Sequence, residues 1–390
     1  MADEVEEAVV ANSREIRMSK PRGRELGLPF PGQPGPLNAI TDVPGVLVGY
    51  ATLDGQSADG KTIKTGVTAI LPRGYHPEPQ PVWAGIHRFN GNGEMTGTHW
   101  IEDAGYFFGP ICITNTHSVG IVHHAAVRWT IRQYASVWPG KHIWAMPVVA
   151  ETYDGRHNDI DGQYVTEADA LLALNSASGG PVAEGNVGGG NGMRSYQFKG
   201  GTGTSSRAVA VDGRAYTVAA LVQSNHGVRD TFTVLGVPVG KHMPLGSATA
   251  QELGSIIIIL ATDAPMLPHQ LQRLARRAAI GFGRNGTFGG NSSGDIFLAF
   301  STANAKQLPQ FSPSHLSMEH INDGACDALY LGAVQCTEEA VINAMLAAED
   351  APEIGPDAAI CKALDHAELL RVMAHYGRMG AAHATDGSPQ

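Results

Sequence analysis

The strongest constraint on the fold is an unbroken apolar run at residues 256–261, which contains four consecutive isoleucines. Isoleucine is β-branched and favours strands, and a strand that is apolar at every position is covered on both faces of its sheet. Residues 39–49 predict two further strands joined by a turn at Pro44-Gly45. Other apolar runs predict strands at residues 66–71, 82–86, 143–149, 208–211, 216–222 and 295–300. Sheets that are buried on both sides are therefore expected.

Helices are expected between these strands, at residues 166–175, 267–281, 338–349 and 364–376. In the second helix, leucines recur on one face, Pro268 lies in the first turn and Gly281 marks the end. No repeat of 20–50 residues is evident, which argues against a solenoid or propeller. The pattern favours a single large α/β domain over residues 22–380. The acidic residues 1–21 and residues 381–390 are expected to be mobile.

Charge and composition exclude several classes of protein. The formal net charge of −10 argues against nucleic acid as a partner, because phosphate binding relies on clustered Lys and Arg. No apolar stretch reaches the ~20 residues that a membrane-spanning helix needs. The four cysteines show no CxxC spacing, which favours reduced thiols in a cytoplasmic protein. The first twenty residues lack an apolar core, so no secretion signal is expected.

The isoleucine run is preceded by Gly254 and Ser255. The ordinary interpretation is a serine that begins a strand after a turn glycine. The alternative is a cleavage site, because a cut between these two residues would leave the Ser255 hydroxyl beside its own α-amine. Such an amine has a reference pKa of ~7.7–8.0, which suits a general base near neutral pH. The buried strand would hold the nucleophile rigidly.

Polar residues at the ends of other apolar runs could serve the same chemistry. Asn225 follows residues 216–222, where its amide could stabilise an oxyanion or simply cap a loop. Ser293 and Asp295 are two apart, so in an extended chain they share one face and could relay a proton; turn chemistry explains them equally well. Glu151 could bind a substrate ammonium and Tyr153 an oxyanion, or both could be the polar end of a strand.

Two other motifs carry less weight. The glycine-rich residues 185–193 lack the Lys-Ser/Thr ending of a P-loop, so nucleotide binding is not favoured. Adjacent His123 and His124 cannot easily face one ion, and no HExxH motif is present. Structural or loop histidines are the better interpretation, and no metal is expected.

In combination, these motifs resemble the DmpA/β-aminopeptidase family, whose members are called L-aminopeptidase/D-esterases. The resemblance spans residues 22–376 in the family's order. It is carried by the segments Ile-Thr-Asp-Val-Pro-Gly-Val at 40–46, Pro-Val-Val-Ala-Glu-Thr-Tyr-Asp at 147–154, Val-Gly-Gly-Gly at 187–190, residues 198–207, Leu-Val-Gln-Ser-Asn at 221–225, Gly-Ser at 254–255 and Ser-Ser-Gly-Asp-Ile-Phe at 292–297.

The resemblance implies an αββα sandwich, with two central sheets flanked by helices. The family makes an inactive precursor that cuts itself before the nucleophile, here giving an α chain of residues 1–254 and a β chain of residues 255–390. Tetramers of such heterodimers are typical. Members release N-terminal residues, some of them β-amino acids, from small peptides, amides or esters, and they use no metal or organic cofactor.

The resemblance also implies roles for the residues named above. Ser255 would attack first the Gly254 carbonyl and later the substrate, with Asn225 and Tyr153 stabilising the oxyanion. Glu151 would bind the substrate ammonium, and Ser293 and Asp295 would orient the serine and its amine and assist proton transfer. Whether the α-amine or this pair is the base stays open. Family members can carry Glu where Asp295 stands, so the shorter side chain here could shift the geometry. Two alternatives stay open: an acyltransferase like ornithine acetyltransferase, and an uncut binding protein.

Overall fold

The computed structural model describes residues 20–244, 254–355 and 359–380. The predicted tail at 381–390 and nearly all of the predicted extension at 1–21 lie outside these residues. The principal strands are β1 (Leu47–Gln56), β2 (Thr62–Leu71), β3 (Val82–Arg88), β4 (Tyr106–Phe107), β5 (Ile111–Asn115), β6 (Val148–Thr152), β9 (Gly201–Val211), β10 (Arg214–Asn225), β11 (Ser255–Thr262) and β12 (Asp295–Ser301). Two short pairs are β7 (Arg194–Ser195) with β8 (Phe198–Lys199), and β13 (Ala351–Pro352) with β14 (Ile360–Cys361). The helices are α2 (Thr98–Ala104), α3 (Val119–Gln133), α4 (Glu167–Asn175), α5 (Val239–His242), α6 (Pro268–Gly283), α7 (Asp327–Leu346) and α8 (His366–His375).

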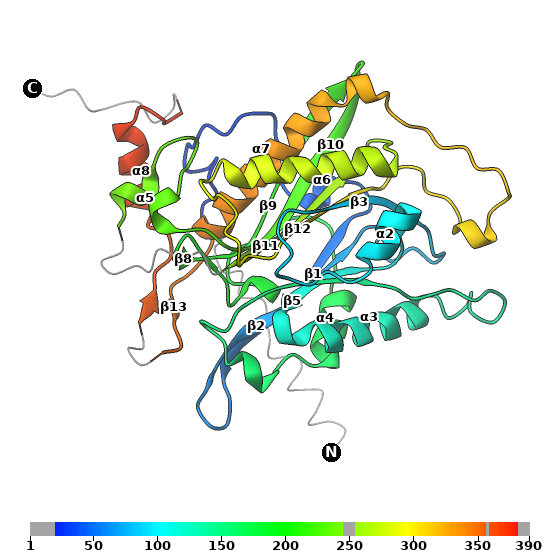
Figure 1. Cartoon of the computed structure of the whole chain (residues 1–390), viewed down its shortest axis with the longest axis horizontal. Helices are drawn as coiled ribbons and strands as arrows, with labels where there is room; N and C mark the ends of the chain where they lie inside the picture. Colours follow the sequence, from blue (N-terminus) through cyan, green and yellow to red (C-terminus); the bar gives the residue numbers. More distant parts are fainter. Residues whose placement is uncertain (1–19, 245–253, 356–358, 381–390) are drawn as a thin grey trace, which may run out of the picture.

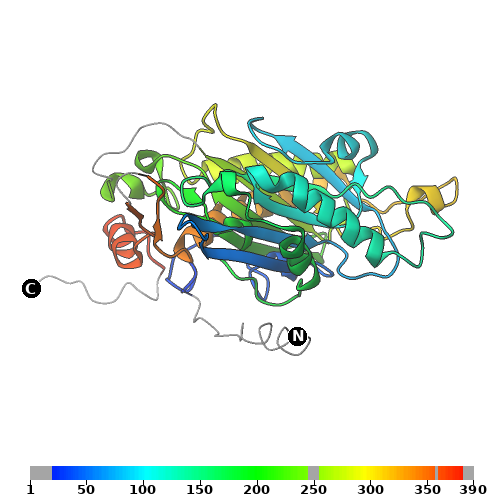
Figure 2. The same cartoon turned by 90° about the horizontal axis from the view of Figure 1, so that it is seen from below.

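Two sheets lie face to face between two layers of helices (Figures 1 and 2). One sheet has the order β1-β2-β5-β6, and the other has the order β4-β3-β12-β11-β10-β9. Helices α3 and α4 cover the outer face of the first sheet, while α6 and α7 cover the outer face of the second. The predicted αββα sandwich is therefore the architecture of this chain.

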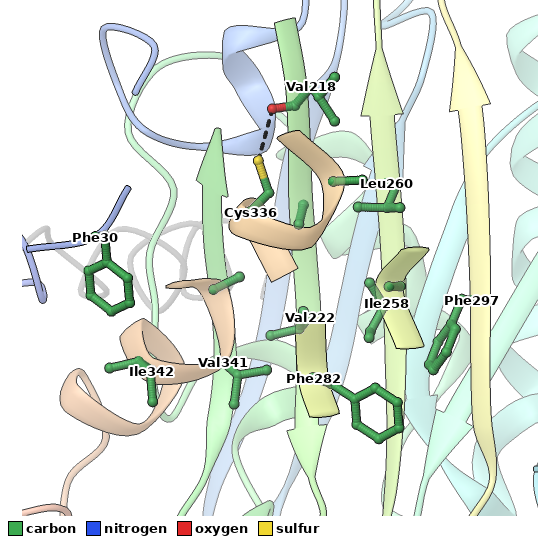
Figure 3. Packing of buried hydrophobic residues seen from close by; sticks show 14 of the residues in the cluster. Phe30, Val218, Val222, Ile258, Leu260, Phe282, Phe297, Cys336, Val341 and Ile342 are labelled. Atoms are coloured by element: carbon green, nitrogen blue, oxygen red, sulfur yellow. Dashed lines mark hydrogen bonds between the residues drawn. The ribbon is translucent and has the colours of Figure 1, made fainter. Parts of the chain in front are cut away.

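The isoleucine run forms β11, in the interior of the six-stranded sheet. Ile256 and Ile258 pack toward α6 and α7, whereas Ile257 and Ile259 pack into the core between the sheets. This alternation is what a strand covered on both faces requires. Figure 3 shows the helix-facing side, where Ile258 lies among aromatic side chains and the Cys336 thiol of α7 donates to the Val218 carbonyl of β10 at 3.0 Å. Strand β11 is thus fixed by packing on both of its faces.

Some predicted elements are wrong in extent or type. Residues 40–42 form a 3-10 helix rather than a strand, because the Asp42 carboxylate accepts the backbone N–H groups of Leu37 and Ala39. The strand predicted at 143–149 begins only at Val148; Pro147 has no N–H with which to join the ladder. Helix α7 begins at Asp327, before the predicted start, because nearly all its later residues are buried and no single face marks its limits.

The pairing of three strands brings their ends to one edge of the six-stranded sheet. Strands β10 and β11 are antiparallel, so the end of β10 meets the start of β11, with Asn225 opposite Ser255. Strands β11 and β12 are parallel, so their starts coincide, with Ile256 opposite Asp295. Strand β6 of the other sheet contacts β11 and ends in Glu151 and Thr152. Among the described helices, none is long and apolar enough to span a bilayer.

Candidate active site

Ser255 lies at the mouth of the space between the two sheets. It has the same strand parity as Ile257 and Ile259, so its side chain faces the inter-sheet side, and it is 7% exposed. The backbone N–H of Gly294 donates to the Ser255 hydroxyl oxygen at 2.9 Å. This bond fixes the hydroxyl in one orientation, as a nucleophile on a rigid strand requires.

The residue before the serine has to be glycine for steric reasons. A Cβ atom added to Gly254 would overlap the backbone carbonyl of Asn225. Because Asn225 is also the ladder partner of Ser255, the Gly254–Ser255 peptide bond lies directly against the end of β10. The sequence pair Gly-Ser therefore reflects close packing of two backbones at this edge.

Asn225 is held at both ends of its amide group. Its Oδ1 accepts the backbone N–H of Arg194 at 2.8 Å, and its Nδ2 donates to the Tyr153 carbonyl at 2.8 Å. An amide nitrogen carries two hydrogens, so this donation leaves the second one for an oxygen that carries developing charge. Asn225 is thus fixed by two bonds, opposite Ser255 on the neighbouring strand, and these bonds leave one amide hydrogen over.

Ser293 and Asp295 contact each other, although Ser293 lies before β12, in a turn where its N–H and its hydroxyl both donate to the Gly290 carbonyl. The Ser293 hydroxyl lies 2.7 Å from Asp295 Oδ2, and Oδ1 of the same carboxylate accepts the Ile256 N–H at 3.2 Å. Asn90, which the sequence interpretation missed, donates to both Ser293 Oγ at 2.9 Å and Asp295 Oδ2 at 3.2 Å. The pair is therefore linked to Ser255 in two ways. Gly294, which lies between the pair in sequence, bonds to the serine hydroxyl, and Asp295 bonds to the next residue, Ile256.

Glu151 lies in the wall of the same cavity and is only 4% exposed. Burial raises the pKa of its carboxyl above the ordinary glutamate value, while hydrogen bonds from the Thr116 hydroxyl and the Glu94 backbone N–H act in the opposite direction. Among the described residues, no cationic side chain forms an ion pair with this carboxylate. A buried carboxylate with this environment gains most from a cationic ligand.

The cavity has a volume of about 690 Å³, within the range of small-molecule sites. Its lining brings together Ser255, Glu151 and Tyr153, which are distant in the sequence. Tyr153 is 46% exposed, and its hydroxyl is so close to Gly155 that a Cβ there would overlap it. The remaining lining residues are Asn92, Gly93, Glu94, Thr116, Gly155, Arg156, Gly254, Ser292 and Ile354.

Most of the lining was not predicted. Residues 90–94 follow β3 and could have been found by the argument used for Asn225, since they are polar residues at the exit of an apolar strand. Arg156 and Ile354 have no such signal. They meet because the Ile354 N–H donates to the Arg156 carbonyl at 2.6 Å, a contact between segments nearly two hundred residues apart.

His226, next to Asn225, is a poor general base. It is 2% exposed, and burial lowers its pKa to about 3. Its ring packs edge-on against Tyr196 and Phe282, in the helix-facing core. Its role is therefore packing.

One group of three described side chains brings possible metal ligands within 4.8 Å of one another: His157, Glu353 and Cys361. Cations surround this group. Arg194 Nε lies 3.2 Å from Glu353 Oε1, and burial together with the charges of Lys199 and Arg194 lowers the pKa of His157 to about 3. A divalent ion would add positive charge beside the buried Lys199 and the half-buried Arg194, so we assign no metal here.

Comparison with known proteins gives a consistent result. The family model for peptidase family S58 matches residues 38–355. The chain belongs to peptidase family S58. A β-peptidyl aminopeptidase, BapA of Sphingosinicella microcystinivorans, is 50% identical over 382 residues, which cover 93% of this chain and 94% of the relative. BapA of Sphingosinicella xenopeptidilytica is 42% identical, with 94% of each chain covered.

Solved structures of similar proteins have the same fold. The L-aminopeptidase D-Ala-esterase/amidase of Ochrobactrum anthropi, described as a prototype of the serine aminopeptidases and a variant of the N-terminal nucleophile hydrolase fold, is 57% identical with a TM-score of 0.89. The alignment covers 93% of this chain and all of that one. A β-aminopeptidase of a Burkholderia species is 45% identical with a TM-score of 0.83, covering 92% and 99%. The present chain is accordingly a hydrolase, a serine aminopeptidase with the N-terminal nucleophile hydrolase fold.

Replacing Tyr153 by phenylalanine is expected to lower kcat about tenfold with little change in KM. The expected loss is moderate because this side chain is half exposed, so water can replace part of a lost hydrogen bond. Steady-state hydrolysis of alanine p-nitroanilide measures it. Tyr164→Phe removes a hydroxyl that bonds to Asp159 instead, and it should leave kcat unchanged. Equal losses in both variants would contradict a role for the Tyr153 hydroxyl.

Proposed function

We propose that this S58 peptidase cuts itself between Gly254 and Ser255 and then uses Ser255 to release small N-terminal residues, α or β, from short peptides, amides and esters. The observation that carries the proposal is the setting of Ser255. It begins a fully buried strand, its hydroxyl is fixed by Gly294, and the peptide bond before it lines the cavity beside Asn225.

In the first step, the Ser255 hydroxyl attacks the Gly254 carbonyl carbon, and water hydrolyses the resulting ester. We assign the hydroxyl proton to the Ser293–Asp295 pair, because no α-amine is free at residue 255 before the cut. The products are residues 1–254, and residues 255–390 with a new α-amine on Ser255.

In the mature enzyme, the same hydroxyl attacks the first carbonyl of the substrate and forms an acyl-enzyme. The α-amine of Ser255 serves as base, oriented by Ser293 and Asp295. Asn225 Nδ2 and the Tyr153 hydroxyl stabilise the oxyanion, and Glu151 binds the substrate ammonium. Recognition of a free N-terminus by a buried carboxylate limits the reaction to aminopeptidase cleavage.

The names of the relatives support this substrate class, since they act on β-peptides or on L-amino-acid and D-alanine derivatives. We further propose that the cut chains assemble as a homotetramer of αβ heterodimers in the cytoplasm, without a cofactor. Size-exclusion chromatography with light scattering tests the assembly.

The proposal predicts that purified wild-type protein consists of two chains that end and begin at residues 254 and 255. Intact mass spectrometry under denaturing conditions measures this directly. The same protein should hydrolyse p-nitroanilides of alanine or β-alanine, and the ratio of their kcat/KM values gives the preference between α and β residues.

Three outcomes would contradict the proposal in different ways. Uncut, folded protein without hydrolysis would favour the non-catalytic binding protein. Acetyl transfer from N-acetylornithine to glutamate would favour the acyltransferase. A cut at another position would remove Ser255 as the nucleophile.

A further inference from the structure

The cavity carries opposite charges on different parts of its wall. Glu151 is held against residues 93 and 94, since Glu94 donates its backbone N–H to the carboxylate and a Cβ at Gly93 would lie 3.2 Å from Glu151 Oε1. Arg156 lies elsewhere, on the side where the β13–β14 segment supplies Ile354. It is the one cationic residue in the described lining of the cavity.

Contacts connect the nucleophile to the surroundings of both charges. From Glu151 they run through Gly93 and Gly294 to Ser255, and from Ser255 through its partner Asn225 to the Tyr153 carbonyl. Tyr153 in turn packs its hydroxyl against Gly155, the neighbour of Arg156. Glu151, Ser255 and Arg156 line one cavity, so a substrate with its ammonium at Glu151 and its first carbonyl at Ser255 can extend its leaving group to Arg156 within that cavity.

Arg156 is half-buried, and none of the described side chains forms an ion pair with it. A guanidinium group presents paired N–H donors that match the two oxygens of a carboxylate. In a dipeptide, the group that follows the scissile bond is a single amino acid with a free carboxylate.

We propose that Arg156 binds the C-terminal carboxylate of the substrate, which makes short zwitterionic peptides, dipeptides above all, the preferred substrates of this enzyme. This inference rests on the proposed aminopeptidase function. It adds a second charged anchor, on the leaving-group side, to the ammonium site at Glu151. The two anchors together set the length of peptide that fits.

The test compares β-alanyl-alanine with β-alanyl-alanine amide, which differ only in the terminal charge. Release of β-alanine is followed by liquid chromatography and mass spectrometry. A charged hydrogen bond contributes about 1.5–3 kcal/mol, so wild-type kcat/KM should favour the free acid by about 10- to 150-fold. In Arg156→Gln this ratio of kcat/KM values should fall to near one. Arg156→Lys should retain part of the ratio, because the lysine ammonium keeps the charge but lacks the paired N–H donors of the guanidinium group.

Two controls separate this inference from its premises. Hydrolysis of β-alanine p-nitroanilide, which has no carboxylate, reports the aminopeptidase activity itself and should change little in Arg156→Gln. Arg132→Gln makes the same charge change on the exposed side of α3 and should keep the wild-type ratio. A wild-type ratio near one overturns the inference, whatever the variants do. So does a ratio that persists in Arg156→Gln, or one that falls equally in Arg132→Gln.

Discussion

Ser255→Ala is expected to yield a single uncut chain of 390 residues with hydrolysis reduced by at least about 10⁴-fold. The substitution removes one oxygen atom that serves both reactions, first the attack on Gly254 and then the attack on substrate. Alanine fits the position without strain, because a smaller side chain at the start of β11 leaves the isoleucine packing intact. Intact mass and p-nitroanilide hydrolysis measure the two losses separately.

Ser292→Ala is the matched control for this prediction. Ser292 lines the same cavity and lies near Gly294 in the sequence. Its replacement by alanine therefore removes one hydroxyl oxygen from the same region. This variant should be cut and should remain active. If Ser255→Ala protein were still cut at residue 254, another nucleophile or a contaminating protease would be responsible, and the proposed self-cleavage would be wrong.

The second large effect is expected for Glu151→Gln, which should lower kcat/KM by at least about 30-fold. The variant leaves the substrate ammonium in a buried site without its counter-charge, and removing one partner of such a pair costs about 2–5 kcal/mol. The amide still fills the space and can still accept from Thr116, so the fold should be retained. Self-cleavage needs no ammonium site and should proceed.

The pH dependence gives an independent test of Glu151. Only the ionised carboxylate binds an ammonium, so kcat/KM should fall as pH drops through the pKa of Glu151 in the free enzyme. Burial raises that pKa, so the acidic limb should lie at higher pH than for an exposed glutamate. In Glu151→Gln the limb attributable to this group should disappear.

Glu94→Gln provides the comparison. Glu94 is the other carboxylate of the cavity, but it is exposed, and exposed charges contribute little to binding. Its backbone N–H, which bonds to Glu151, is unchanged by the substitution. A larger loss in Glu94→Gln than in Glu151→Gln would transfer the ammonium site to Glu94.

The sequence predicted those parts of the fold and site that depend on local pattern. The isoleucine run identified β11, and Ser255 was singled out because it directly precedes that run. The spacing of Ser293 and Asp295 predicted a shared face, and the two side chains are in contact. Such inferences succeed because local backbone geometry alone relates residues that are close in the sequence.

The rest could not be predicted because it depends on long-range packing. Asn90 reaches Ser293 and Asp295 only because β3 pairs with β12, about two hundred residues later. Arg156 meets the cavity through Ile354, and nothing local marks either residue. The 3-10 helix at Ile40–Asp42 was mistaken for a strand because its one apolar residue, Ile40, is buried whichever backbone form it adopts.

The strand order determines what a cut before Ser255 would produce. Strands β11 and β12, which follow the cut, lie between β3 and β10, which precede it. The shorter fragment is thus inserted into the middle of the longer fragment's sheet, and its helix α7 also covers β9 and β10. The two fragments are interlocked rather than docked, so they should stay together until the whole molecule unfolds.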